Sequence, residues 1–239
     1  MTNMHEDYAR NVYREEEMPE YFGDVIEYVI KKIDHGDVCD LGSHAIGHYW
    51  AMGYIERVQS YSCYDLSREA LDIMQKTLDN WESGDIRKKH GYYLQYLREK
   101  NVIEAADEEI ETQIRTKLAD VRQFDFLKDT PDRKYDIVMA NESLPVVDDF
   151  DQFLKAMQTC YDFLKPGGLL LTVSGQYERV TSYISEMQDH KIEGRLNPGA
   201  ADFTKAMKQT GFKEIETKTI PVTYPDYIAV DICSARKGN

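Results

Sequence analysis

The sequence predicts a doubly wound α/β fold, in which a mostly parallel sheet carries helices on both faces. Short apolar runs alternate along the chain with amphipathic stretches. This alternation is expected where each strand of a parallel sheet is followed by a crossover helix. The last two apolar runs, "KEIETKTIPV" and "YIAVDICSARK", have no helix between them. A parallel return needs a crossover, so these final strands are expected to be antiparallel.

The chain has 239 residues, of which 42% are hydrophobic and 30% charged. This length suits one domain with a sizeable core, and we expect a single domain over residues 1–239. Residues 1–22 would form an N-terminal cap. Residues from about 82 to 115 would form a helical insertion, because this stretch is longer than an ordinary connection between a strand and a helix.

Composition also limits the partners. The net charge of −14 would repel phosphate backbones, so we expect no nucleic-acid partner. No apolar run is long enough to cross a bilayer, and the N-terminus lacks the apolar core of a signal peptide. The four cysteines form no CxxC pair and are expected to be buried, reduced thiols. These features predict a cytoplasmic monomer or homodimer without a membrane partner.

In the first half of the chain, apolar residues recur at helical spacing from Met18 to Ile33, with Pro19 in the first turn of the predicted helix. "DVCDLG" and "VQSYSCYDLS" read as buried strands, and the second ends near Asp65. Ser67 is a candidate N-cap for the helix that follows. Within the insertion, "DEEIETQIRTKLADV" predicts a helix that leads into a third strand.

The second half continues the alternation. A fourth strand begins at Tyr135, and "DDFDQFLKAMQTCYDFL" predicts a helix. A "KPGG" turn then leads into the buried strand "LLLTVSG". The helix "AADFTKAMKQTGF" is expected to end at Gly211, before the two closing strands.

Ligands of an open α/β sheet bind beyond the carboxyl ends of its strands, so polar residues at those ends are the candidates for a site. Gly42, after the first strand, permits a sharp turn and close approach of a ligand. Asp65, after the second strand, can accept hydrogen bonds from both hydroxyls of a ribose. Asp120 and Val121, at the expected end of the third strand, can bond an adenine amino group and a ring nitrogen. "ANESL" follows the fourth strand, where reacting groups would meet.

These motifs, with the "LKPGG" turn and the antiparallel last strand, resemble the class I S-adenosylmethionine-dependent methyltransferases from about Phe22 to Lys237. The resemblance implies a Rossmann-like, seven-stranded methyltransferase sheet and S-adenosylmethionine as the cofactor. It also implies methyl transfer to a small-molecule acceptor. The tyrosine-bearing N-terminus, "CDLGS" and the insertion are similar to the nicotinamide, phenylethanolamine and indolethylamine N-methyltransferases, which favours N-methylation.

The resemblance implies roles for matching residues. Asp40, Gly42 and Ser43 would shape the loop beneath the methionine part of the cofactor. Asp65 would hold the ribose, with Leu66 beside it. The remaining implied cofactor contacts are Asp120 and Val121 at the adenine, Asn141 near the methionine end or the acceptor, and Tyr8 and Tyr13 closing over the cofactor.

The chain departs from this pattern at His44, where amine methyltransferases usually carry glycine. Residues other than glycine disfavour positive φ, so the loop must run differently or His44 must be strained. His44 is a candidate general base because histidine titrates near neutral pH. A solvent-facing loop histidine fits the sequence equally well. His44 and His48 are four residues apart, but no third ligand is nearby in sequence, so we expect no metal.

Two other acids are candidate catalytic residues. Glu142 follows the fourth strand, and Glu178 is the nearest acid to Ser174. Amine methyltransferases tend to carry an acid at the position of Ser174 to hold the substrate amine, so its absence weighs against an amine. A methyltransferase acting on a protein or peptide and a non-catalytic partner subunit remain alternatives. The presence of Asp65, Asp120 and Val121 argues against the non-catalytic subunit.

Overall fold

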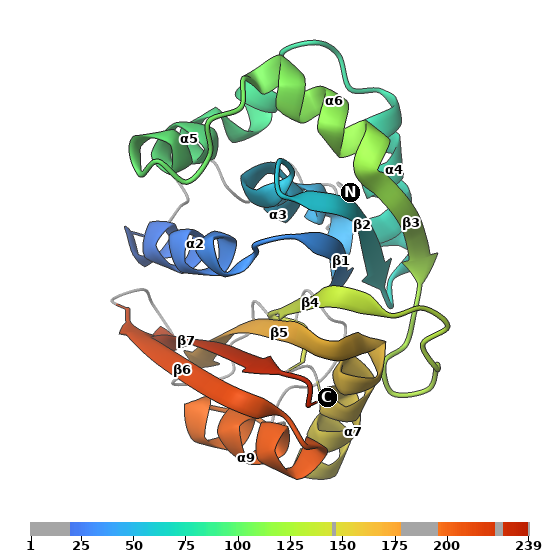
Figure 1. The fold of residues 1–239 in the computed structure, drawn as a ribbon, viewed down its shortest axis with the longest axis vertical. Helices are drawn as coiled ribbons and strands as arrows, with labels where there is room; N and C mark the ends of the chain where they lie inside the picture. The colour runs from blue at the N-terminus through green and yellow to red at the C-terminus, as the bar shows by residue number, and fades with distance from the viewer. Residues whose placement is uncertain (1–19, 145–146, 178–195, 223–226, 239) are drawn as a thin grey trace, which may run out of the picture. The chain divides into compact units, whose positions relative to one another are not determined.

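The computed structural model describes residues 20–144, 147–177, 196–222 and 227–238. Its seven described strands follow the order β3-β2-β1-β4-β5-β7-β6 (Figure 1). The pairs β1–β2, β2–β3 and β4–β5 are parallel, whereas β7 is antiparallel to both β5 and β6. The predicted fold class is confirmed. The chain divides into two compact units, Met1–Phe124 and Asp125–Asn239.

The first unit contains three of the strands. Its elements are α2 (Glu20–Lys32), β1 (Gly36–Leu41), the 3-10 helix η2 (His44–Ile46), α3 (His48–Tyr54), β2 (Val58–Asp65), α4 (Arg68–Asp79), α5 (Asp85–Glu99), α6 (Asp107–Lys117) and β3 (Leu118–Gln123). Helix α2 buries the expected apolar stripe, in which Val25, Val29 and Ile33 have no exposed surface. The Ser67 hydroxyl accepts a hydrogen bond from the Ala70 N–H at 3.2 Å, which confirms the predicted N-cap of α4.

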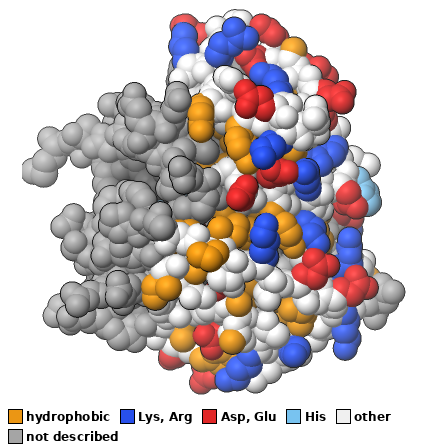
Figure 2. Space-filling view, turned by 90° about the vertical axis from the view of Figure 1, so that its left-hand side faces the viewer, with side chains coloured by type: hydrophobic (Ala, Val, Ile, Leu, Met, Phe, Trp, Pro, Cys, Tyr) orange, Lys and Arg blue, Asp and Glu red, His pale blue; other side chains and the backbone are white. Residues whose placement is uncertain are grey.

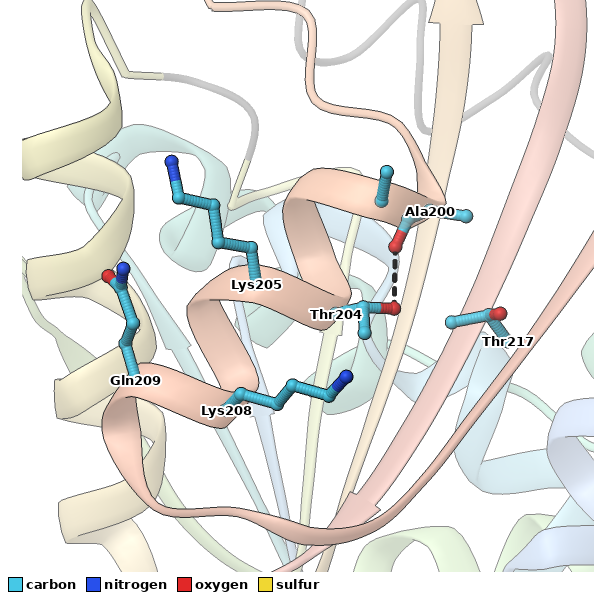
Figure 3. A pocket seen from close by; sticks show the side chains of 7 residues that line it. Ala200, Thr204, Lys205, Lys208, Gln209 and Thr217 are labelled. Atoms are coloured by element: carbon cyan, nitrogen blue, oxygen red, sulfur yellow. Dashed lines mark hydrogen bonds between the residues drawn. The ribbon is translucent and has the colours of Figure 1, made fainter.

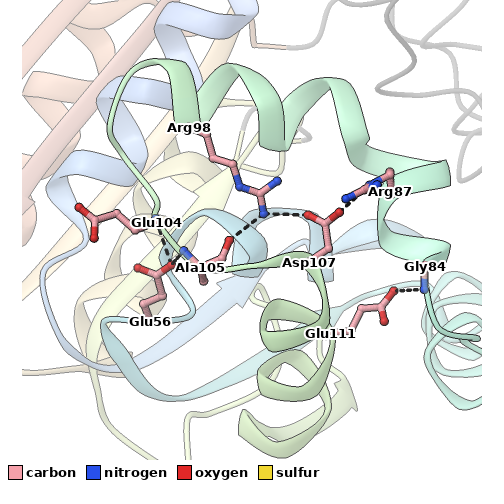
Figure 4. Close-up of polar contacts among 8 residues, drawn as sticks. All are labelled: Glu56, Gly84, Arg87, Arg98, Glu104, Ala105, Asp107 and Glu111. Atoms are coloured by element: carbon pink, nitrogen blue, oxygen red, sulfur yellow. Dashed lines mark hydrogen bonds and ion pairs between the residues drawn. The ribbon is translucent and has the colours of Figure 1, made fainter.

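The expected insertion forms α5 and α6, which ion pairs hold together (Figure 4). Asp107 accepts hydrogen bonds from Arg87 at 2.8 Å and from Arg98 at 2.7 Å. Burial raises the pKa of Asp107, but these two guanidinium groups outweigh it and hold the pKa below its usual value. Glu111 accepts a hydrogen bond from the Gly84 N–H at 3.0 Å. Asp107 and Glu111 are therefore buried structural acids.

The second unit contains the remaining strands. Its elements are β4 (Tyr135–Asn141), α7 (Phe150–Phe163), β5 (Leu164–Tyr177), α9 (Ala200–Thr210), β6 (Lys213–Pro221) and β7 (Tyr227–Arg236). Helices α7 and α9 pack against each other. The rings of Phe153 and Phe203 meet edge to face, with their centroids 4.9 Å apart. Helix α9 ends where expected, at Gly211, whose φ of 99° is left-handed.

The expected "KPGG" turn is not a separate turn but part of a strand. The residues "KPGG", Lys165–Gly168, lie inside β5, where they form an irregularity in its pairing with β4. Gly167 has a φ of 75°, which glycine adopts without strain. Its N–H donates to the Lys237 carbonyl at 3.1 Å, and the Lys237 N–H donates to the Gly168 carbonyl at 2.9 Å. These bonds to the chain beyond β7 keep the segment in the sheet.

The cysteine prediction is confirmed: Cys39, Cys63, Cys160 and Cys233 are all buried and free of disulfides. Within the described residues, no helix combines the length and the apolar character needed to cross a bilayer. On the face that Figure 2 shows, acidic and basic side chains of these residues are interspersed.

Candidate functional site

The loop after β1 turns sharply and is tied to the end of β2. Gly42 has a φ of 79°, as its role in a tight turn requires. The N–H groups of Gly42 and Ser43 both donate to the Tyr64 carbonyl, at 2.6 and 3.2 Å. The loop therefore begins beside the carboxyl end of β2, where Asp65 lies.

The sequence left two alternatives, a different loop path or a strained backbone at His44. The structure shows the strained backbone. Its φ is 50°, a left-handed value that is uncommon outside glycine. This conformation lets the His44 N–H donate to Asp65 Oδ2 at 2.7 Å. The Ser67 N–H donates to Asp65 Oδ1, also at 2.7 Å. Two backbone donors thus fix the carboxylate of Asp65, and each of its oxygens can accept more than one hydrogen bond.

Asp40, the last acid of β1, is only 2% exposed. Its Oδ2 has no hydrogen-bond partner among the described residues, and the same is true of the buried hydroxyls of Ser43 and Tyr54. Burial, and then the nearby charge of Asp65, raises the pKa of Asp40 to about 8. Unsatisfied buried polar atoms are rare in proteins, so three of them in this part of the unit fit a site that binds a polar ligand.

Leu66 follows Asp65 and is 61% exposed, which is unusual for a large apolar side chain beside a polar loop. Its carbonyl accepts a hydrogen bond from Gln123 Nε2 at 2.8 Å, and Gln123 pairs with Asp65 across β2 and β3. Gln123 therefore holds the chain next to Asp65. No local sequence signal marks Gln123 for this role, because its partner is 57 positions away.

Asp120 and Val121 do not lie at the end of β3, and this placement is a correction. Asp120 is the third residue of the strand, which continues to Gln123 because Val121–Gln123 pair with Cys63–Asp65. The Asp120 carboxylate accepts hydrogen bonds from the Tyr64 hydroxyl at 2.9 Å and from Arg122 at 2.7 Å. It is thus held by neighbours on the sheet.

The first acid after β3 is Asp125, at the start of the second unit. Its carboxylate contacts Lys128 at 2.8 Å and accepts a hydrogen bond from the Leu127 N–H at 2.9 Å. Burial raises the pKa of Asp125, but these two contacts outweigh it, so the pKa lies below its usual value. Asp125 therefore lies two residues beyond β3, whereas Asp120 was expected at the end of that strand.

In the second unit, Asn141 is the last residue of β4 and Glu142 follows it. Both amide atoms of Asn141 are buried and have no hydrogen-bond partner among the described residues. Glu142 has a left-handed φ of 52°, and its N–H donates to the Val173 carbonyl at 2.8 Å. Its Oε1 accepts a hydrogen bond from the Gly175 N–H at 2.9 Å. Strained residues of this kind cluster at functional sites, which supports this strand end as one.

Asp231 on β7 is a buried acid that the sequence pattern did not reveal. It has no exposed surface and pairs directly with Ser174 on β5, the position where an acid was expected. It accepts hydrogen bonds from Gln176 Nε2, from the Ala200 N–H at 2.7 Å and from the Thr219 hydroxyl at 2.5 Å. Tyr8, Tyr13 and Glu178 lie outside the described residues.

A groove of about 560 Å³ runs along α9 and β6 (Figure 3). Its lining includes Thr204, Lys205, Lys208 and Thr217. The Thr204 hydroxyl donates to the Ala200 carbonyl at 2.8 Å. None of the predicted site residues lines this groove, so it is not the candidate site. Among the described residues, no group of three or more His, Cys, Asp or Glu side chains is arranged to hold a metal ion.

A family model described as "Methyltransferase domain" matches residues 13–217, which is most of the chain. The chain belongs to this methyltransferase family. The predictions of an S-adenosylmethionine-dependent enzyme and of a class I methyltransferase fold are thereby confirmed. A comparison with curated protein sequences finds no match.

Solved structures similar to this methyltransferase include the N-methyltransferase NodS from Bradyrhizobium japonicum WM9 in complex with S-adenosylhomocysteine. NodS has a TM-score of 0.62 and 11% identity, covering 98% of this chain and 97% of that one. The DhpI–S-adenosylhomocysteine complex has a TM-score of 0.54 and 18% identity, covering 97% and 94%. The Haloferax volcanii complex of the Trm112 methyltransferase activator with a methyltransferase has a TM-score of 0.60 and 14% identity, covering 100% of both chains. At these identities the likeness is one of fold, and the narrower resemblance to the amine methyltransferases remains a prediction.

Proposed function

We propose that this methyltransferase transfers the methyl group of S-adenosylmethionine to nitrogen on a small-molecule acceptor. The observation that carries the cofactor part is the carboxylate of Asp65, which two backbone N–H groups hold at the carboxyl end of β2. Both oxygens of a carboxylate fixed in this way can receive ribose hydroxyls. The likeness to NodS, an N-methyltransferase, supports nitrogen as the acceptor atom.

The residues of the first unit would bind and orient the cofactor. Gly42 and Ser43 would shape the loop under its methionine part, where Asp40 offers a buried oxygen that lacks a partner among the described residues. Leu66 would cover one face of the adenine with its exposed side chain. For the adenine amino group, Asp120 remains the prediction from the sequence.

When bound, the cofactor supplies a methyl group that its sulfonium has already activated. The protein therefore needs to align the acceptor, exclude water and, for some acceptors, remove a proton. A free amine needs no strong base, whereas a hydroxyl acceptor does. His44 and Glu142 remain the candidates for that base, Glu178 remains a candidate catalytic residue as the acid nearest to Ser174, and Asn141 would contact the methionine end or the acceptor. Tyr8 and Tyr13 keep their predicted role as a cover for the cofactor.

Calorimetric titration with S-adenosylhomocysteine tests the cofactor site. We expect micromolar binding, which corresponds to roughly −8 kcal/mol. Asp65→Ala removes the acceptor for the ribose hydroxyls and should weaken binding by about 1–3 kcal/mol. Asp72→Ala is the matched control, because Asp72 is a surface acid of α4 that pairs with Arg68 at 2.9 Å. Equal affinity of all three proteins would contradict the assignment of Asp65, and no binding by folded wild type would overturn the proposed site.

A partner-dependent methyltransferase is the second candidate function, because one similar solved structure is a complex with the Trm112 methyltransferase activator. In that case the acceptor would be a protein or peptide, or the chain would act as a non-catalytic subunit. Light scattering on the purified chain tests the expected monomer or homodimer. Methyl transfer by the chain alone to a small amine would exclude the need for a partner. The cytoplasmic location remains a prediction.

A further inference from the structure

We propose that Gln176 selects the methyl acceptor by accepting a hydrogen bond from its amine N–H, and that Asp231 is the positioning residue that sets the orientation of Gln176. The inference rests on the proposed function as an N-methyltransferase and names the group that would recognise the amine. Gln176 is the second-last residue of β5, so it lies at the carboxyl end of a strand, where an open α/β sheet binds its ligands.

The contacts of Asp231 determine which way the Gln176 amide faces. Asp231 Oδ2 accepts a hydrogen bond from the backbone N–H of Ala200, a group that can only donate. That oxygen is therefore an acceptor, and the amide atom of Gln176 facing it must be the donor, Nε2. The carbonyl oxygen Oε1 then lies at the other end of the amide. It accepts no hydrogen bond from the described residues, although the side chain is half-buried.

Gly199 leaves room for this arrangement. A Cβ atom added at Gly199 would lie 2.8 Å from Gln176 Nε2 and 3.7 Å from Asp231 Oδ2. The φ of Gly199 is −95°, a value open to any residue, so glycine is needed here for space. The start of α9 is therefore shaped to let the Gln176 amide reach Asp231.

A second acid holds the residue before Gln176. Glu142 Oε1 accepts the hydrogen bond of the Gly175 N–H at 2.9 Å, so two carboxylates bind consecutive residues at the end of β5. Their negative charge favours the ammonium form of an amine, and the Gln176 oxygen adds a directional acceptor. The bound ammonium group loses one proton, to water or to the candidate base Glu142, before its nitrogen accepts the methyl group. This arrangement would compensate for the serine at position 174, where amine methyltransferases tend to carry an acid. Asp231 pairs with Ser174 across the sheet and would act on the acceptor through Gln176.

The test measures binding of amines to the protein saturated with S-adenosylhomocysteine. The probes are benzylamine, 2-phenylethylamine and tryptamine, each compared with its quaternary N,N,N-trimethyl derivative. The two members of a pair have the same charge, but only the primary amine has an N–H to donate. We expect at least one primary amine to bind wild type about tenfold more tightly than its derivative. Gln176→Leu should abolish this preference.

Variants of Asp231 distinguish a role in orienting Gln176 from a role in stabilising the fold alone. Asp231→Asn should keep the preference, because the Asn oxygen can face Ala200 and Gln176 while the Thr219 hydroxyl turns to accept from the Asn amide. Asp231→Leu should lose the preference. The side-chain amide signals of Gln176 in a nitrogen-15 spectrum give a second readout. They should be protected from exchange in wild type and Asp231→Asn and unprotected in Asp231→Leu. If Asp231→Leu does not fold, Gln176→Leu alone decides the proposal.

Two results would overturn the proposal. One is a wild type that binds every amine no better than its quaternary derivative. The other is a preference for primary amines that survives in Gln176→Leu. Both are distinct from failure of the proposed function, in which folded wild type would not bind S-adenosylhomocysteine at all.

Discussion

Asp40 in the first unit and Asp231 in the second are buried to nearly the same degree, with 2% and 0% of their surface exposed. They differ in what surrounds the carboxyl group. Asp231 accepts hydrogen bonds from a side-chain amide, a backbone N–H and a hydroxyl. Asp40 has an oxygen with no partner among the described residues. Burial alone therefore does not identify a ligand site. A buried acid with all its donors supports the fold, and one without them is suited to a ligand.

The largest effect is expected from removing the satisfied acid. Asp231→Ala leaves the Ala200 N–H, the Thr219 hydroxyl and the Gln176 amide without their acceptor. The free energy of unfolding should fall by roughly 3–5 kcal/mol, because buried donors are costly to leave unpaired. Urea denaturation followed by circular dichroism measures it. A loss below about 1 kcal/mol would mean that water replaces the carboxylate and that the contrast with Asp40 is weak.

The second effect concerns the pH dependence that Asp40 confers. Its pKa is raised to about 8, so the folded protein keeps a proton that the unfolded chain releases above about pH 4. The folded state binds more protons, so the free energy of unfolding falls as pH rises through this range. We expect wild type to lose about 3–4 kcal/mol between about pH 5 and pH 8 that Asp40→Asn does not lose.

Parallel urea titrations of the two proteins at several pH values measure this difference. Identical pH profiles would show that Asp40 has an ordinary pKa and a partner, which would remove the contrast with Asp231. Asp136→Asn serves as the control, because Asp136 is a partly exposed acid that pairs with Lys165 at 2.8 Å.

A smaller effect is expected at Gly199. Gly199→Ala places a methyl group 2.8 Å from Gln176 Nε2, so the flexible end of that side chain must move away from Asp231. The loss of one buried hydrogen bond should cost about 1 kcal/mol. Thermal unfolding of the variant, alone and combined with Gln176→Leu, checks the mechanism. The two substitutions should cost less together than the sum of their separate effects, and full additivity would show that Gly199 acts elsewhere.

The smallest effect is expected at His44. His44→Gly relieves the left-handed φ of 50° and keeps the backbone N–H that donates to Asp65. Relief of strain and the greater freedom of glycine in the unfolded chain oppose each other, so stability should change by less than about 1 kcal/mol. Affinity for S-adenosylhomocysteine should stay within about threefold. A larger loss in the calorimeter would show that the imidazole itself contacts the cofactor.

The sequence predicted those parts of the fold and site that depend on local pattern. Asp65 lies at the end of β2, and Ser67 caps α4, because strand ends and caps are encoded by neighbouring residues. Asp120 was misplaced because β3 continues for three residues beyond it, and that extension depends on pairing with β2. Such pairing joins residues far apart in the chain and leaves no local signal.

Asp231 was missed for the same reason. An acid in an otherwise apolar strand indicates a buried role only when its partners are known. Those partners are Gln176, Ala200 and Thr219, at separations of 55, 31 and 12 residues. His44 is intermediate between the residues that the sequence predicted and those that it missed. The sequence limited its backbone to two options, and the hydrogen bond to Asp65 selects the left-handed one.

The single oxygen Asp231 Oδ2 accepts hydrogen bonds from Gln176 at the end of β5 and from Ala200 at the start of α9. It therefore joins the end of β5 to the start of α9. Closing a longer loop costs only about 0.6 kcal/mol for each doubling of its length. Because one atom joins these two elements, we expect changes in the length of the chain between them to leave both elements in place. Under the proposed function, a new acceptor specificity could evolve through changes in this part of the chain while Asp65 and the loop after β1 stay as they are.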